Sequence, residues 1–200
     1  GRVTSVDGMT GTLDSAVTIP AAGITGVLPV GVTGGSGLDA VVGITQVTTQ
    51  TLSGSSNDFT IGSSAKRFTI QLNGASMTAN GQTVGIQLGD AGGIETSGYS
   101  GIGGTKNIWS DYASVNSSAS FTINGTAEMD ATSGWYGILL FEQVQGTETW
   151  VGSGLGGNVG QSRFHGWGGT KTLSAEITTI RIITGGTFNA GTMSYHSDHR

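Results

Sequence analysis

Large side chains are distributed unevenly along this 200-residue sequence. The first fifty residues contain no aromatic side chain, and all 4 Trp, 4 Tyr and 6 Phe lie between Phe59 and Tyr195. A segment without large side chains cannot bury enough apolar area to offset the conformational entropy that it loses on folding. We therefore expect residues 1–50 to be ordered only by other chains or by the body that follows, and residues 51–200 to form that body.

The body is predicted to be all-β. Glycine occurs 37 times, and each glycine weakens a helix interior by ~1 kcal/mol relative to alanine. The stretch 66–73 alternates, with Phe68, Ile70 and Leu72 on one face. Residues 137–144 begin as a nearly continuous apolar run, the pattern of a strand buried on both faces. Short strands separated by glycine turns predict an antiparallel β-sandwich of jelly-roll type.

Two glycine-containing segments lead to specific predictions. Gln145-Gly146 suits a hairpin, and a two-residue loop there would pair Phe141 with Trp150. Gly152–Gly157 matches the pattern Gly-x-Gly-x-x-Gly of nucleotide-binding loops, but no helix or βαβ unit surrounds it. We expect a flexible surface loop at that position.

Composition excludes several classes of protein. The net charge of −5 and the absence of cysteine argue against nucleic-acid binding, disulfides and thiolate metal sites. No apolar run approaches the ~18 residues of a membrane span, and no signal segment opens the chain, so membrane insertion is not expected. Because the chain begins Gly1-Arg2, we expect it to be a piece of a longer protein.

The first fifty residues resemble the shaft segments of bacteriophage tail fibres. The resemblance is carried by Val3–Gly11, with its Asp7-Gly8 turn, and by Gly26–Val41, which contains Leu28-Pro29-Val30 and Gly34-Gly35-Ser36-Gly37-Leu38. In that family, three chains wind around a common axis. The resemblance therefore implies a short, intertwined homotrimeric shaft or collar in residues 1–50.

The remaining residues resemble the C-terminal head of the same fibre proteins, in stretches that bracket residues 51–200 at both ends. The matching segments are Asp58–Ile61, Ala65–Ile70, Ile86–Tyr99 and Ile180–Met193. The resemblance implies a virion protein at the distal tip of a tail fibre, joined to the rest of the fibre. Its function would be attachment to a host-surface receptor, most plausibly a glycan such as lipopolysaccharide or capsule, or another outer-membrane receptor.

Aromatic residues outside the regular alternation are the candidates for that receptor site. Aromatic rings stack on sugar rings while short polar side chains bond hydroxyls. We expect receptor contacts from three segments, whose candidate residues are Trp109, Asp111, Tyr112, Trp135, Tyr136, Arg163, His165 and Trp167.

An enzyme and a decoration protein are the alternatives. A polysaccharide depolymerase of the glycosidase type needs two carboxylates ~5–9.5 Å apart, and Glu128 with Asp130, or Glu142 with Glu148, are the available pairs. We expect all four to be solubilising surface residues, and hence no enzyme and no cofactor. An esterase lacks its Ser-His-Asp pattern. A structural decoration of the virion remains the third hypothesis.

The C-terminus offers a possible metal site. His196 and His199 flank Ser197-Asp198, and one motif repeated around a threefold axis would supply several ligands. A frayed polar terminus is the plainer interpretation.

Overall fold

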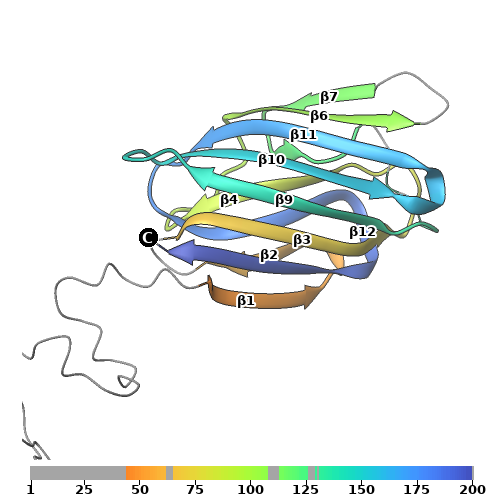
Figure 1. The fold of residues 1–200 in the computed structure, drawn as a ribbon, viewed down its shortest axis with the longest axis horizontal. Helices are drawn as coiled ribbons and strands as arrows, with labels where there is room; N and C mark the ends of the chain where they lie inside the picture. Colours follow the sequence, from red (N-terminus) through yellow and green to blue (C-terminus); the bar gives the residue numbers. More distant parts are fainter. Residues whose placement is uncertain (1–43, 62–64, 108–112, 126–128, 130, 200) are drawn as a thin grey trace, which may run out of the picture. The chain divides into compact units, whose positions relative to one another are not determined.

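The computed structural model describes residues 44–61, 65–107, 113–125, 129 and 131–199. Twelve strands form one curled, antiparallel sheet (Figure 1). The strands are β1 (Ile44–Thr51), β2 (Gly54–Thr60), β3 (Ala65–Met77), β4 (Val84–Asp90), β5 (Gly93–Ile94), β6 (Tyr99–Asn107), β7 (Ala113–Ser117), β8 (Phe121–Thr122), β9 (Trp135–Gln143), β10 (Thr149–Asn158), β11 (Arg163–Thr172) and β12 (Ile177–His199). Among the described residues, the helical structure is a short 3-10 turn, Val159–Gln161 (η2), and no helix is long and apolar enough to cross a membrane.

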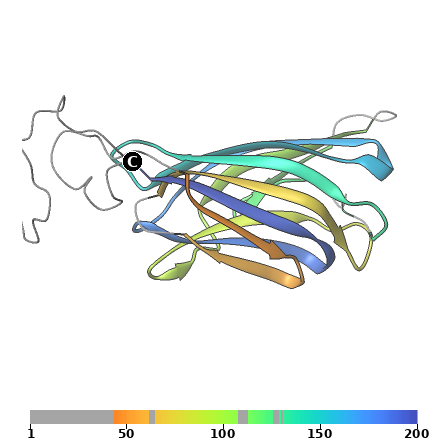
Figure 2. The ribbon, with the colours of Figure 1, turned by 60° about the horizontal axis from the view of Figure 1, so that its bottom comes forward.

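The long strand β12 divides this sheet into two layers. Its first half pairs with β2 and β4, and its second half pairs with β1 and β3. Register irregularities between Ile183 and Phe188 mark the bend, next to Gly185-Gly186. The segment from β1 to β2 and the segment from β3 to β4 bend beside β12. The three segments therefore pass together from one layer to the other (Figure 2). Bulges and glycines are the usual means by which a strand turns such a corner.

The larger layer continues from β3 through β9, β10, β11 and β6 to β7, and the smaller layer contains β2, β4, β5, β8 and the first half of β12. Between the layers lies one hydrophobic core, which includes Phe68, Ile70 and Leu72. The prediction of an all-β, antiparallel, sandwich-like head is confirmed.

The boundary of the head differs slightly from the boundary read in the sequence. Residues 44–50 belong to β1, where Ile44 pairs with Asp198 and Gln50 with Met193. The shaft predicted for residues 1–50 lies otherwise outside the described residues, and its trimeric winding stays a prediction.

Aromatic rings fill the centre of the core. Phe68 stacks on Phe141 with ring centroids 4.5 Å apart, and Phe121 contacts Phe141 and Trp167 at 5.4 and 5.5 Å. Trp150 lies 5.2 Å from Phe68. Such pairs each add about 0.5–1.5 kcal/mol beyond the area that they bury.

The predicted pairing of Phe141 with Trp150 is wrong. Val144 N donates to Thr149 O (2.8 Å), so the hairpin loop spans residues 145–148 rather than two residues. Trp150 consequently pairs with Gln143, and Phe141 pairs with Gly152 on one side and Phe68 on the other. The shift is two residues, so every side chain keeps its predicted face while its cross-strand partner changes.

The predicted surface loop at Gly152–Gly157 is also wrong, because this segment is the middle of β10, between β9 and β11. Its inward glycines make room for rings from neighbouring strands. A Cβ at Gly152 would lie 2.7 Å from both Phe141 and Trp167, and a Cβ at Gly156 would overlap the indole of Trp135. Glycine in a strand interior commonly marks such a close approach.

Strand β9 is buried on one face only, which corrects the prediction of two buried faces. Leu139 and Phe141 are fully buried, whereas Ile138, between Gly137 and Leu139, is 58% exposed. The smaller layer covers the inner face, and no element of the described residues covers the outer face.

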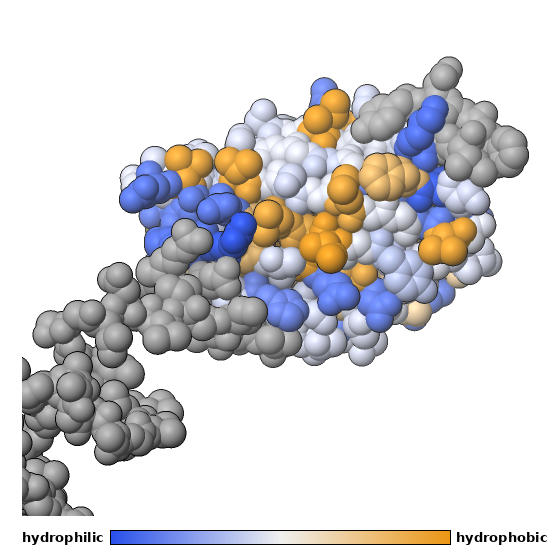
Figure 3. Space-filling view, viewed as in Figure 1, coloured by the Kyte–Doolittle hydropathy of each residue, from blue (hydrophilic) through white to orange (hydrophobic). Residues whose placement is uncertain are grey.

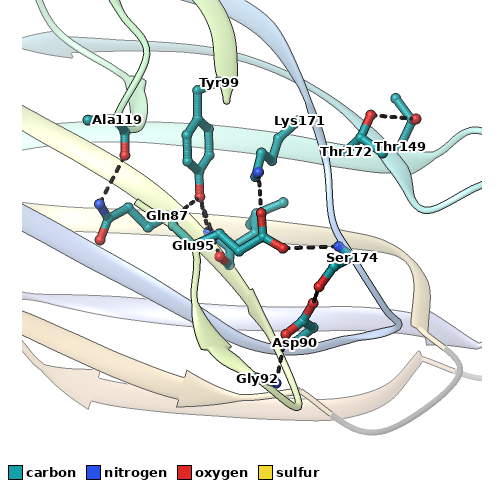
Figure 4. A network of polar contacts seen from close by, with 11 residues as sticks. Gln87, Asp90, Gly92, Glu95, Tyr99, Ala119, Thr149, Lys171, Thr172 and Ser174 are labelled. Atoms are coloured by element: carbon teal, nitrogen blue, oxygen red, sulfur yellow. Dashed lines mark hydrogen bonds and ion pairs between the residues drawn. The ribbon is translucent and has the colours of Figure 1, made fainter. Parts of the chain in front are cut away.

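Several polar side chains join the two layers (Figure 4). Lys171 on β11, which is buried, forms an ion pair with Glu95, which is 26% exposed, and the Tyr99 hydroxyl donates to Glu95 O (2.9 Å) while accepting from Leu88 N (2.7 Å). The Ser174 hydroxyl donates to Asp90 (2.6 Å), and this hydrogen bond, with that from Gly92 N, lowers the pKa of Asp90. Burial raises the pKa of Tyr99 to about 12. We call this group of contacts the layer clasp.

Candidate binding site at the distal end

Strand register defines two ends of the head. At one end, Arg67 pairs with both Asp198 and Glu142, and Asp198 pairs with Ile44. At the other end, a continuous row crosses five strands of the larger layer through Ala75, Trp135, Asn158, Arg163 and Asn107. We call the first the proximal end, because β1 begins there, and the second the distal end.

Three of the predicted receptor residues belong to the distal end. Trp135, Tyr136 and Arg163 lie at or beside the distal row. Trp109, Asp111 and Tyr112 lie outside the described residues. Sequence segments far apart in the chain therefore converge on one end of the sheet.

Three of the candidates point into the core. Trp135 and His165 are fully buried and Trp167 is 7% exposed. Trp135 contacts His165 edge-on with centroids 6.1 Å apart, and Trp167 packs on Phe121 and Phe141. A ring in this position supports the strands from beneath and cannot stack on a ligand without opening the sandwich.

The exposed side of the same strands carries a different set of side chains. Tyr136, Gly157, Phe164 and Lys106 are directly opposite one another in register, so they share one face. Tyr136 is 46% exposed and Phe164 is 53% exposed. The strands that carry these two exposed rings are about 10 Å apart, two strand spacings, and a glycine lies between the two residues in the cross-strand row. We call these four residues the distal aromatic row.

Phe164 was missed among the candidates selected from the sequence, although its segment was recognised. Strand alternation could have identified it: with Trp167 and His165 on one face of β11, Phe164 must lie on the other.

Polar contacts brace the distal end from inside. The His165 imidazole bonds through Nδ1 to Thr105 Oγ1 (2.8 Å), which also accepts from Gly125 N (2.9 Å). Asn124, fully buried, accepts from Val84 N (2.7 Å) and donates to Gln82 O (2.9 Å). These bonds connect β6, β11 and β4 near the distal end.

Acidification should lower the stability of the protein through His165. Burial, with a smaller contribution from the charge of Arg163, lowers the pKa of His165 to about 4. The unfolded chain takes up the proton near pH 6.5, so stability is complete above that pH and is lost as the pH falls toward 4. From pH 7.5 to pH 5 we expect a loss of about 2 kcal/mol at ~1.4 kcal/mol per pH unit, measured by urea unfolding. His165→Gln should flatten the profile, and an unchanged profile would contradict this assignment.

The metal site predicted for His196 and His199 stays a prediction, because its ligands would come from three chains around an axis, and the carboxylate pairs are described only in part. His196 pairs with Val47 and Thr69, and the backbone of His199 pairs with Ala65. Within the described part of the chain, no group of three or more His, Cys, Asp or Glu side chains could hold a metal ion. Glu142 lies 3.9 Å from Arg67 at the proximal end, and Glu128 and Asp130 lie outside the described residues.

Next to the distal aromatic row, the outer surface of the larger layer is apolar (Figure 3). An open depression of about 870 Å³ lies there, and its lining includes Tyr136, Ile138, Leu155 and Phe164. Such a surface, with few hydrogen-bonding groups, suits contacts with rings and apolar side chains rather than proton transfer.

Comparisons with protein-family models, curated proteins and solved structures found no match for this chain.

Proposed function

We propose that this chain is the receptor-binding tip of a bacteriophage tail fibre, in which a homotrimer attaches the virion to a glycan on the host surface. The observation that carries the proposal is the position of the distal aromatic row. Its two exposed rings stand at the end of the head opposite the start of β1. A tip needs its ligand-binding groups at the end remote from the stalk.

The chemistry of the row suits a neutral sugar. Tyr136 and Phe164 offer ring faces to pyranose C–H groups, and the Tyr136 hydroxyl and the Lys106 ammonium add hydrogen-bonding groups. Gly157 between the rings leaves the surface low enough for a chain of sugars to cross. Three such sites on one tip would convert weak single contacts into firm attachment through effective concentration.

Removing both rings should abolish most of the binding. We expect Tyr136→Ala/Phe164→Ala to bind an array of purified bacterial lipopolysaccharides and capsular polysaccharides at least about tenfold more weakly, equivalent to ~1.4 kcal/mol. Because both side chains are about half exposed, thermal stability should change little. Val159→Ala is the matched control, since Val159 is 77% exposed and lies in the same distal region outside the row.

Three outcomes would contradict the proposal. The intact chain could fail to bind any glycan and fail to compete with phage for adsorption to cells, as a decoration protein would. The double variant could bind as well as the control. Shortened polysaccharide after incubation would identify a depolymerase instead.

A further inference from the structure

The outer face of β9, β10, β11 and β6 bears apolar side chains on two of its cross-strand rows. The row nearer the distal end contains Ile138, Leu155, Gly166 and Gly104, and the next contains Leu140, Ser153, Gly168 and Ile102. Ile138 is 58% exposed and Leu155 is 61% exposed. We call these two rows the outer apolar face.

This face consists of a ridge beside a groove. Leu155 and Ile138 project side by side from β10 and β9, whereas the adjacent strand β11 presents only Gly166 and Gly168 in the same rows. A Cβ built on Gly168 would meet only the Gly152 oxygen, at 3.7 Å, whereas one built on Gly166 would meet Leu155 Cδ2 at 3.5 Å, so the groove is deepest above Gly168. Ile102 on β6 closes the far side of the groove. A ridge and a groove of one strand's width each lie next to each other on the same surface.

The apolar area is large for a surface that stays in water. Four side chains that are each about half exposed present on the order of 400 Å², in the range of the largest apolar patch of a monomer, which is often functional; they are Ile102, Ile138, Val151 and Leu155. A standard interface covers about 800 Å² per partner. The exposed apolar surface is therefore enough for the centre of such an interface.

The sequence of β9 supports the same conclusion. Its run Ile138-Leu139-Leu140-Phe141 has the composition of a strand that is covered on both sides, yet the part of the chain that the structure describes covers only one side. Charged side chains are confined to the margins of the larger layer, with Arg67 and Glu142 toward the proximal end and Lys106 at the distal end. Apolar centres with charged margins are typical of contacts between subunits.

We propose that the outer apolar face is where the heads of neighbouring copies of this chain meet, with the Leu155–Ile138 ridge of one copy in the Gly166–Gly168 groove of the next. This inference deepens the trimeric assembly proposed above and rests on it. Because ridge and groove lie side by side on one surface, each can meet its complement on another copy. The distal aromatic row would then lie at the rim of the contact, beside the partner.

Photo-crosslinking of the full chain tests which surface meets the partner. A benzoylphenylalanine at Leu155 should yield covalent multimers on a denaturing gel, with the crosslinked peptide mapping to β10 or β11 of another copy. The matched control places the same group at Ser56, which is also exposed but lies on β2 in the smaller layer. Multimers from Ser56 and none from Leu155 would overturn the inference, as would a chain that remains monomeric by light scattering at micromolar concentration.

Charge substitution provides an independent measurement. Because Leu155 is 61% exposed in the single chain, Leu155→Lys should leave the fold of one head intact. We expect self-association at least tenfold weaker in a sedimentation dilution series, whereas Ser56→Lys should leave it unchanged. Equal association of the two variants would place the contact elsewhere.

These results are separable from a failure of the proposed function. Crosslinks from Leu155 without binding to any glycan would retain the interface and remove the receptor assignment. Glycan binding without those crosslinks would do the reverse.

Discussion

Replacing Lys171 by Met is expected to lower the free energy of unfolding by about 3 kcal/mol, the lower part of the range for breaking a buried ion pair. Lys171 is 5% exposed, lies over the Tyr99 ring at 5.2 Å and pairs with Glu95 across the two layers. Glu95 is 26% exposed, which sets the loss at the low end of the range. Without the ammonium group, the Glu95 carboxylate loses its cation and keeps its bond from Ser174 N (3.0 Å). Urea unfolding followed by tryptophan fluorescence measures the loss.

Two controls separate the buried charge from the lost packing. The pair Lys171→Met/Glu95→Leu should recover most of the stability, since an apolar pair of similar volume is often as stable as a buried ion pair. Arg181→Met removes an ion pair with Asp58 that is made by two 2.6 Å bonds but is 32% and 46% exposed, so about 0–1 kcal/mol should be lost. Equal losses from Lys171→Met and Arg181→Met would refute the importance of burial.

Gly156→Ala adds only one carbon atom, yet we expect it to lower the free energy of unfolding by a similar amount. Its Cβ would overlap the Trp135 ring, with Cε2 at 2.7 Å, and the same ring lies against Gly137, where a Cβ would be 2.6 Å from Cζ3. The ring is fully buried and cannot move aside without opening the core. Overpacking a core costs about 1–3 kcal/mol, occasionally more, and we expect about 3 kcal/mol, or roughly 6–12 °C in the thermal midpoint.

The controls for Gly156→Ala lie on the same and the adjacent strand. A Cβ at Gly166 on β11 meets the Leu155 side chain only at 3.5 Å, so Gly166→Ala should shift the midpoint by a few degrees at most. Gly156→Ala/Trp135→Leu exchanges the large ring for a smaller side chain and should recover part of the loss. If the Gly156→Ala and Gly166→Ala variants were equally stable, the packing of the Trp135 ring would not depend on Gly156.

The candidate site was only partly predictable because a strand pattern assigns side chains to faces without saying which face is outward. The aromatic residues near 135 and 164 were identified from their neighbours, and the structure brings both segments to the distal end. Which ring points outward depends on where the core lies. Trp135 and Trp167 occupy the inner face, and so Tyr136 and Phe164, their neighbours in the alternation, are the exposed rings.

Which residues pair across strands, and whether a segment is central or exposed, depended on contacts between residues far apart in the chain. The four residues of the 145–148 loop decide that Phe141 stacks on Phe68 rather than pairing with Trp150, and loop length is not encoded in strand alternation. The glycines of β10 indicated a loop by local propensity. They form a central strand because indole and phenyl rings from β9 and β11 occupy the space where their side chains would be.

The sequence by itself determined the all-β class and the shared buried face of Phe68, Ile70 and Leu72, since glycine content and two-residue alternation act locally along the chain. Only the tertiary structure decided the fold of β12 across two layers, the convergence of distant segments at the distal end, and the bare outer face of β9 and β10. These features depend on which strands become neighbours. That choice depends on the packing of rings and on ion pairs between segments far apart in the chain: Asp58 and Arg181 are 123 residues apart, and Glu95 and Lys171 are 76 residues apart.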